Sequence, residues 1–286
     1  MDVRTIGICV KPGEPELAEL VRDLEKWLAD RGLEVLPDAE AGRWTRASGM
    51  RREDIAARAD LVVVLGGDGT LLAVTREFAD RGAPILSVNL GTMGFLAEIA
   101  PEDLFPTVDA VLAGRFRVED RMRFDVAVER AGENLGSFTA LNDAVVASTA
   151  LSRMVYLQTY ADGAEVTTYH GDGLIVATPT GSTAYSLSAG GPLLLSTADA
   201  IVLTPISPHA LTQRPLVLPG TCGVEVHVLD PRGGGVQLTV DGQVGRSLEE
   251  GDVVRVRRSA HPARLLVPPD RNRFQVMRAK LRWGER

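Results

Sequence analysis

The residues best suited to chemistry form a short glycine-rich turn, in which residues 66–70 read Gly-Gly-Asp-Gly-Thr. An apolar run, residues 61–65, precedes the turn, and the apolar side chains of residues 71–79 recur at helical spacing. Glycines on both sides of Asp68 let the backbone approach a ligand, and the first N–H groups of a helix favour an anion. Phosphoryl transfer to a hydroxyl needs a phosphate beside a carboxylate. A tight β-to-α connection without a ligand would also explain this turn.

A second ligand-binding loop is predicted where an apolar strand, residues 174–177, runs into a segment rich in glycine and hydroxyl groups. Residues 178–188 read Thr-Pro-Thr-Gly-Ser-Thr-Ala-Tyr-Ser-Leu-Ser. Hydroxyls and backbone N–H groups suit phosphate or ribose oxygens, although serine and threonine are equally common in solvated connections.

Two adjacent polar residues, Asn142 and Asp143, interrupt a predicted strand over residues 137–147. Burying them costs free energy unless they are hydrogen-bonded, so either a ligand with several hydroxyls or an internal network would account for them. Residues 89–95 (Asn-Leu-Gly-Thr-Met-Gly-Phe) follow another predicted strand, 84–88, and are expected to form a further turn at the same end of the sheet. Ligands bind at the C-terminal ends of parallel strands in such folds.

The elements that position these residues change in character near residue 114. Before it, strands at 5–10, 33–36, 61–65 and 84–88 alternate with helices, which implies a mainly parallel sheet covered on both faces. After it, short alternating runs separated by turns such as Ala161-Asp162-Gly163 and Gly233-Gly234-Gly235 imply antiparallel β-structure. We therefore predict an α/β domain over 1–114, a β domain over 115–268 and a helical tail over 269–286 that packs back on the first domain.

Composition is typical of a folded protein, with 45% hydrophobic and 24% charged residues in a chain of 286. A net charge of −7 argues against nucleic acid as a partner. The start of the chain has no basic leader and no apolar run reaches eighteen residues, so we expect a cytoplasmic protein that does not bind membranes. The two cysteines and four histidines indicate neither a disulfide framework nor a metal site. Neither G-x-x-x-x-G-K-[ST] nor G-x-G-x-x-G occurs, so any nucleotide is held in another way.

Taken together, these motifs strongly resemble the NAD kinase family, and the resemblance runs from the first strand to the tail. Gly-Gly-Asp-Gly-Thr alone is shared with diacylglycerol and sphingosine kinases and, more distantly, with phosphofructokinases. The long Thr-Pro-Thr-Gly-Ser-Thr-Ala-Tyr element is typical of NAD kinases. The other segments that carry the resemblance are residues 89–95, 141–143, 207–215 (Ser-Pro-His-Ala-Leu-Thr-Gln-Arg-Pro) and 240–243 (Val-Asp-Gly-Gln).

The resemblance implies a Rossmann-like N-terminal α/β domain, a C-terminal β-sandwich domain, a site in the cleft between them and a homo-oligomer, either a dimer or a tetramer. It also implies the reaction: transfer of a terminal phosphoryl group from ATP or inorganic polyphosphate to the 2′-hydroxyl of the NAD adenosine ribose, giving NADP. Mg²⁺ or another divalent cation would accompany the phosphate donor.

Residue by residue, the resemblance makes Asp68 the general base and places the phosphate donor on a loop formed by Gly66, Gly67, Gly69 and Thr70. Many family members carry Asn-Glu where this chain has Asn142-Asp143, which withdraws the carboxylate by one methylene. The NAD-binding residues implied are Asp68, Gly69, Phe95, Asn142, Asp143, Arg153, His170, Asp172, Thr183, Ala184, Tyr185, Ser186, Leu187, Ser188 and Gln243.

Two alternatives differ from this reading. A lipid kinase of the same superfamily would keep residues 66–70 but needs an apolar or membrane-facing acceptor surface, which no basic or aromatic cluster indicates. A non-catalytic NAD-binding regulator would keep the dinucleotide loops and would need neither Asp68 nor Mg²⁺.

Overall fold

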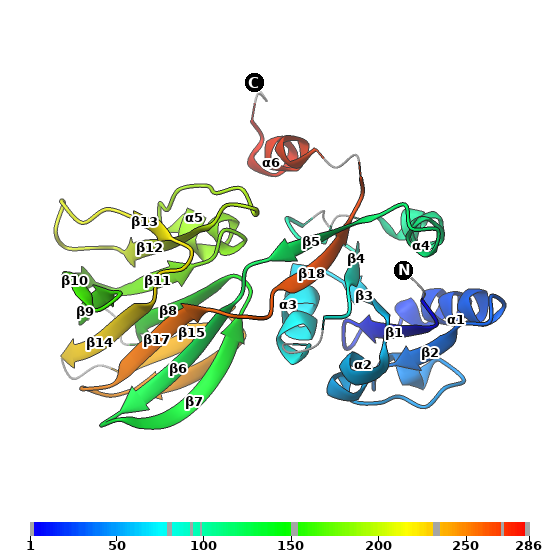
Figure 1. Ribbon diagram of the computed structural model, residues 1–286, viewed down its shortest axis with the longest axis horizontal. Coiled ribbons are helices and arrows are strands. Elements are labelled where there is room, and N and C mark those ends of the chain that lie inside the picture. The colour runs from blue at the N-terminus through cyan, green and yellow to red at the C-terminus, as the bar shows by residue number, and fades with distance from the viewer. Residues whose placement is uncertain are drawn as a thin grey trace. The chain divides into compact units, whose positions relative to one another are not determined.

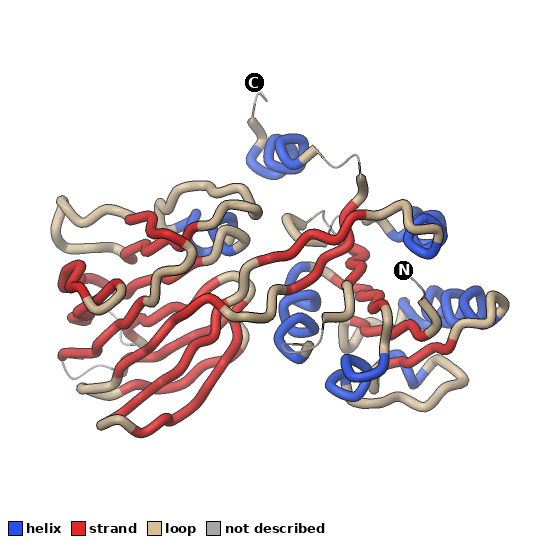
Figure 2. Tube along the Cα trace, viewed as in Figure 1, coloured by secondary structure: helices blue, strands red, loops and turns tan. Residues whose placement is uncertain are grey.

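The structure, a computed structural model, describes residues 3–78, 82–91, 94–97, 99–149, 154–230, 235–269 and 272–283. The chain divides into two compact units: Met1–Asp120 with Ala263–Arg286, and Arg121–Pro262. Figures 1 and 2 show the helices and strands of each unit.

These divisions differ from the predicted boundaries at 114 and 268. The strands β5 (Arg117–Arg121) and β18 (Ala263–Val267) both belong to the sheet of the first unit. The first unit therefore extends to Asp120 and resumes at Ala263, because both connecting segments are strands and not linkers.

The sheet of the first unit has the strand order β2-β1-β3-β4-β18-β5. Four strands, β1 (Thr5–Val10), β2 (Glu34–Pro37), β3 (Leu61–Gly66) and β4 (Ile85–Asn89), pair in parallel, and β18 is parallel to β4. The predicted parallel arrangement is therefore confirmed, and the carboxyl ends of β3 and β4 lie next to each other.

Helices cover both faces of this sheet, and alternate residues of β3 show why. Val63 packs in one core with α1 (Leu17–Ala29) and α4 (Leu104–Leu112), whereas Val62 and Val64 pack in another with α2 (Arg52–Arg58) and α3 (Asp68–Glu77). Burial on both faces accounts for the uninterrupted apolar run of β3. Helix α6 (Arg273–Leu281) follows β18, and short 3₁₀ turns occupy Ala41–Arg43 and Pro101–Asp103. None of the helices in the described ranges is long and apolar enough to span a membrane.

The second unit is a β-sandwich, as predicted. Its two antiparallel sheets have the orders β10-β9-β14-β17-β6-β7 and β13-β12-β11-β8-β15-β16, and one apolar core contains residues from both. The strands are β6 (Phe124–Arg130), β7 (Glu133–Ala140), β8 (Asp143–Ser148), β9 (Val155–Ala161), β10 (Ala164–Gly171), β11 (Gly173–Ala177), β12 (Ala200–Ile206), β13 (Leu216–Pro219), β14 (Val224–Asp230), β15 (Val236–Val240), β16 (Val244–Leu248) and β17 (Val253–Arg258).

The prediction of one strand over residues 137–147 is wrong. The segment forms the end of β7 in one sheet and most of β8 in the other, with Leu141 and Asn142 at the crossing between them. Apolar alternation continues across the break because both strands face the same core. Asn142 and Asp143 therefore lie where β8 begins, at one end of the sheet, and not in the middle of a strand.

Candidate active site

The Gly-Gly-Asp-Gly-Thr turn joins β3 to α3 as predicted. Gly66 ends the strand, Gly67 precedes the helix, and Asp68 is its first residue. The carbonyl of Gly67 accepts the N–H groups of Thr70 and Leu71, so the helix begins immediately after it. Thr70 is buried, and a side chain on Gly66 would overlap it, which explains the need for glycine there.

The Asp68 carboxylate is held by three consecutive backbone N–H groups. Phe95 donates to Oδ2 at 2.9 Å, while Leu96 and Ala97 donate to Oδ1 at 3.2 and 2.9 Å. An ionised carboxylate has about four lone-pair directions, so roughly one is left for a ligand. Gly94 permits this approach, because a Cβ at that position would overlap the carboxylate.

A pocket of about 750 Å³ opens beside this turn, within the first unit. It is lined by the predicted donor loop, Asp68 and residues at and after the end of β4. Charged side chains from three other parts of the chain also line it. The lining residues of most interest are Gly66, Gly67, Asp68, Gly69, Thr70, Asn89, Gly94, Lys11, Glu14, Glu16, Arg52 and Lys280. Phe95, another of the predicted residues, contacts the site through its backbone N–H, which donates to the Asp68 carboxylate.

The predicted NAD-binding residues of the second unit gather mainly at one end of a sheet, where β8 begins and β11 and β15 end. Asp143 is paired with Ala177 of β11, and the chain after β15 supplies Asp241. The Asp241 carboxylate accepts the N–H groups of Leu141, Asn142 and Asp143 at 3.0, 2.7 and 3.2 Å. This internal network fixes the crossing and leaves the Asn142 side chain partly exposed.

Asp143 is 4% exposed. Burial, and secondarily the nearby charge of Asp241, raise the pKa of Asp143 to about 7. The carboxyl of Asp143 therefore changes its protonation state near neutral pH, and its protonated form donates a hydrogen bond that a carboxylate would not.

Most hydroxyls of the second predicted loop hold the loop together. Thr178 donates to the Leu141 carbonyl at 2.6 Å, Ser182 to the Pro179 carbonyl at 2.7 Å, and Ser186 pairs with Thr204 at 2.8 Å. All three are buried and have partners within the protein, so the structure gives each a role in holding the loop together. The predicted positions that stay partly or fully exposed are Thr183, Ala184, Tyr185, Leu187 and Ser188.

Thr180 is a candidate that the sequence did not single out. Its hydroxyl oxygen is buried and has no hydrogen-bond partner among the described residues. The loop is close to Asn142, since a side chain on the adjacent Gly181 would overlap the Asn142 backbone. An unsatisfied buried hydroxyl costs about 1–3 kcal/mol, so a ligand that accepts its hydrogen bond would recover this cost.

The other predicted residues are placed differently. Asp172 and His170 lie at the opposite end of β11 from Asn142, separated by the strand's five residues, about 17 Å. His170 stacks on Tyr156 with ring centroids 4.2 Å apart. Gln243 is exposed in the turn after Asp241. Arg153 lies outside the described residues.

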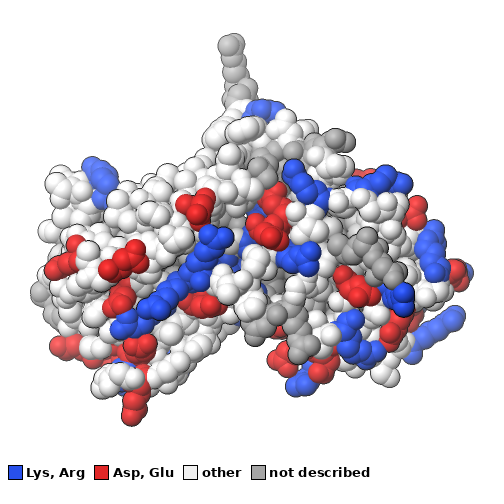
Figure 3. Space-filling model, in the orientation of Figure 1, with Lys and Arg blue, Asp and Glu red and all other residues white. Residues whose placement is uncertain are grey.

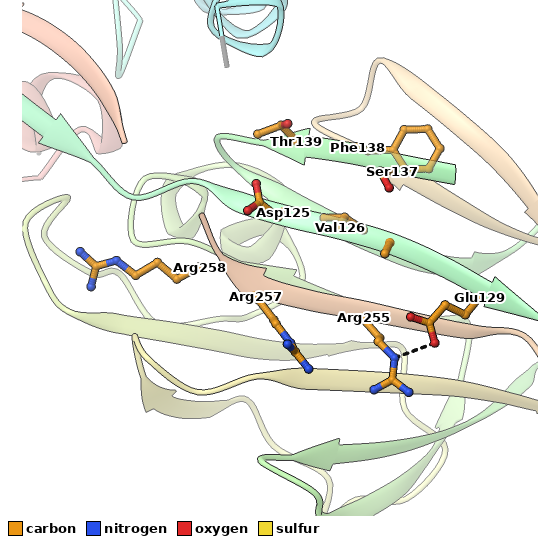
Figure 4. Close-up of a pocket in the computed structure, with 10 residues that line it drawn as sticks. Asp125, Val126, Glu129, Ser137, Phe138, Thr139, Arg255, Arg257 and Arg258 are labelled. Atoms are coloured by element: carbon orange, nitrogen blue, oxygen red, sulfur yellow. Dashed lines mark hydrogen bonds and ion pairs between the residues drawn. The ribbon is translucent and has the colours of Figure 1, made fainter. Parts of the chain in front are cut away.

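A second pocket, about 620 Å³, lies over β17, β6 and β7 (Figure 4). Arg255, Arg257 and Arg258 line it, but Arg255 pairs with Glu129 at 2.8 Å and Arg258 with Asp199 at 2.8 Å. Figure 3 shows the same intermixing of positive and negative side chains over the visible face. This pocket has no glycine-rich turn and no helix start, so it is the poorer phosphate site.

Within the described ranges, no group of three or more His, Cys, Asp or Glu side chains is arranged to hold a metal ion. The pocket's carboxylates are Glu14, Glu16 and Asp68. Mg²⁺ is commonly held by one or two carboxylates together with substrate phosphates and water. These residues therefore fit an ion that arrives with a phosphate donor.

Both halves of the chain match protein-family models. Residues 6–116 match the ATP-NAD kinase N-terminal domain, and residues 141–267 match the ATP-NAD kinase C-terminal domain. The chain belongs to the NAD kinase family. It is therefore an enzyme, a phosphotransferase, as the motifs predict.

Relatives over the full length agree. The NAD kinase of Geobacter sulfurreducens is 46% identical over 285 residues, which cover 99% of this chain and 100% of the relative. The NAD kinase of Solibacter usitatus is 45% identical over 285 residues, covering 99% of each chain.

Solved NAD kinase structures confirm the fold. The chain resembles yeast NADH kinase complexed with NADH, with a TM-score of 0.90 and 25% identity, covering 99% of this chain and 89% of that one. It also resembles an NAD kinase from Archaeoglobus fulgidus in complex with ATP, with a TM-score of 0.72 and 26% identity, covering 97% and 98%.

Proposed function

We propose that this chain transfers the terminal phosphoryl group of ATP or inorganic polyphosphate to the 2′-hydroxyl of the NAD adenosine ribose, forming NADP. The observation that carries this proposal is the Asp68 carboxylate, fixed by three N–H groups at the start of α3 beside a pocket of about 750 Å³. The complexes of related kinases with NADH and with ATP support the choice of substrates.

In this proposal Asp68 accepts the proton of the 2′-hydroxyl as the oxygen attacks the terminal phosphorus in line; the bond from that phosphorus to its bridging oxygen breaks, and ADP or the shortened polyphosphate leaves. The donor's phosphates lie against Gly66, Gly67, Gly69 and Thr70, where the first turn of α3 favours anions. Bound Mg²⁺ would neutralise phosphate charge. The three N–H bonds restrict the carboxylate to one orientation, and such positioning of reactants contributes about 7–11 kcal/mol.

In the second unit, Asn142 and Asp143 hold the NAD riboses in this proposal, with the exposed positions of residues 183–188 around the dinucleotide. In this proposal Ser186, which is buried and pairs with Thr204, supports that loop. The cytoplasmic location and the homo-oligomer stay predictions; cell fractionation and light scattering measure them.

The three N–H bonds to Asp68 also favour one alternative, in which the carboxylate only stabilises the turn and the protein binds NAD without turnover. No comparable structural observation favours the lipid kinase alternative. The two roles of Asp68 predict different losses: a base contributes to turnover, whereas a turn acceptor contributes to the free energy of unfolding.

The deciding experiment measures NADP⁺ formation from NAD⁺, Mg²⁺ and either ATP or polyphosphate, with Asp68→Asn beside the wild type. We expect turnover to fall by about 10²–10⁴-fold with NAD binding retained. Asp60→Asn is the matched control, because Asp60 likewise accepts two backbone N–H groups, from Arg4 and Thr5, at 2.9 Å outside the pocket. Equal turnover by wild type and Asp68→Asn, with a lowered melting temperature, would assign Asp68 to the turn alone.

A further inference from the structure

Three cationic side chains line the pocket beside Asp68, and they differ in how they are paired. The Arg52 Nε lies 2.9 Å from Asp38 Oδ2, its Nη2 donates to the Val10 carbonyl at 3.0 Å, and Glu77 is 3.7 Å away. Lys11 pairs with Glu14, which also lines the pocket. Lys280 forms no ion pair with any residue that the structure describes. Of the three cations it is therefore the one whose charge is not paired with a carboxylate there.

Lysine is rare in this chain, and its distribution is uneven. Of 31 basic residues only three are lysines, Lys11, Lys26 and Lys280, and two of these three line the pocket. An ammonium is a compact point charge with three donors, whereas a guanidinium is a planar fork. A compact ammonium can contact oxygens of neighbouring phosphates in a phosphate chain. The glycine backbone of the same pocket can bind other oxygens of that chain.

Lys280 reaches the pocket from the far end of the sequence. It lies in the last turn of α6, a helix whose start is capped by the Asn272 side chain, which accepts the N–H groups of Phe274 and Gln275 at 3.1 and 3.3 Å. Arg278, two residues earlier in the same helix, is exposed and does not line the pocket. The helix thus brings one particular cation to the site.

We propose that Lys280 binds the phosphate chain of the phosphoryl donor, an inference that rests on the proposed function of this pocket. The pocket also contains Glu14, Glu16 and Asp68, which repel a polyanion. Lys280 offsets this repulsion, and its charge-assisted hydrogen bonds fix the position of the chain. The C-terminal helix is accordingly part of the donor site and not only a structural tail.

The test compares Lys280→Gln with Arg278→Gln, which removes the same charge from the same helix. Magnesium tripolyphosphate and magnesium ATP are titrated into each protein by calorimetry without NAD, and NAD binding is titrated separately. We expect Lys280→Gln to weaken binding of both phosphate ligands by about tenfold or more, the scale of one charge-assisted hydrogen bond, with NAD affinity unchanged. Arg278→Gln should stay within about twofold of wild type, and Lys280→Arg should recover only part of the loss.

Kinetics separate this inference from the function on which it rests. If the wild type forms NADP⁺, Lys280→Gln should raise the KM for the donor and leave the KM for NAD⁺ unchanged. Weaker tripolyphosphate binding by Lys280→Gln, in a protein that forms no NADP⁺, supports the phosphate site while the proposed reaction fails. Donor binding equal to that of Arg278→Gln, or a wild type that binds neither phosphate ligand, overturns the inference even if NADP⁺ is made.

Discussion

Asp143 and Asp241 are joined by reciprocal backbone contacts: the Asp241 N–H donates to the Asp143 carbonyl at 3.0 Å, and the Asp143 N–H donates to Asp241 Oδ1 at 3.2 Å. The same Asp241 carboxylate also binds the two preceding N–H groups. The Asp241 carboxylate thus accepts three backbone N–H groups, while the Asp143 carboxyl is buried beside it with a raised pKa. We therefore expect the two residues to affect stability differently: Asp143 through pH, and Asp241 through substitution.

The first prediction concerns pH. The pKa of Asp143 is about 7 in the folded protein against an ordinary 3.8. Between these values the folded state retains a proton that the unfolded state has lost, so the free energy of unfolding falls as pH rises. The contribution of the protonated group is complete below about pH 4 and is lost as pH passes about 7.

Urea unfolding at pH 5, 6, 7 and 8 measures this slope. Asp143→Asn, which stays neutral, should show a smaller decrease than the wild type over the same range. Identical slopes for the two proteins would show that Asp143 does not titrate there.

The second prediction concerns Asp241. Asp241→Asn replaces an oxygen acceptor by an amide, so at least one of three N–H groups loses its partner at a cost of about 1–3 kcal/mol. The crossing that carries Asn142 should loosen, and NAD affinity should fall. Asp162→Asn is a matched control, because Asp162 likewise has a positive φ (48° against 51°), precedes a glycine and accepts one N–H, from Gly223.

Melting temperature and NAD titration distinguish the outcomes. Asp162→Asn should lower the melting temperature slightly with NAD affinity unchanged, whereas Asp241→Asn should lower both. If Asp241→Asn binds NAD as tightly as the wild type, the segment between β7 and β8 does not contribute to the dinucleotide site.

The third prediction concerns Gly94, the residue against which the Asp68 carboxylate rests. Gly94→Ala introduces a Cβ that overlaps this carboxylate, so Asp68 must move. A displacement of about 1 Å costs roughly 10²-fold in rate when reactants are positioned in line. Gly91→Ala, in the segment that follows β4, serves as control because its Cβ would meet nothing within 4 Å. Steady-state turnover should separate the two variants; equal turnover would mean that the carboxylate's position is not limiting.

The fourth prediction uses two threonines of one loop. Thr180→Val removes a buried hydroxyl that has no partner among the described residues, so stability should be unchanged or increased, while NAD binding weakens if the ligand accepts its hydrogen bond. Thr178→Val instead removes a hydroxyl that donates to the Leu141 carbonyl and accepts the Gly181 N–H, so stability should fall. Differential scanning calorimetry with and without NAD tests both; the same NAD-induced shift in Thr180→Val and wild type would exclude the contact.

Local patterns were sufficient to predict the Asp68 turn, because a buried strand and an amphipathic helix each have their own periodicity. They were insufficient for residues 137–147, since the break between β7 and β8 depends on Asp241, 100 residues from Leu141. Composition left two roles open for the hydroxyls of residues 178–188 for a similar reason: whether a serine faces a ligand or a carbonyl depends on how the loop folds. Lys280 joins the pocket through the packing of α6, which composition does not reveal.

The position of β18 between β4 and β5 has a consequence for biosynthesis. During translation, β4 and β5 leave the ribosome before β18, and the whole of Arg121–Pro262 is made in the interval. The sheet of the first unit is therefore completed only after Arg121–Pro262 has been made, when β18 and the helix that carries Lys280 emerge. A chain that terminates before Ala263 would contain the entire β-sandwich but would lack Lys280 in its phosphate pocket, so we expect it to bind the phosphate donor more weakly than a chain that contains Lys280.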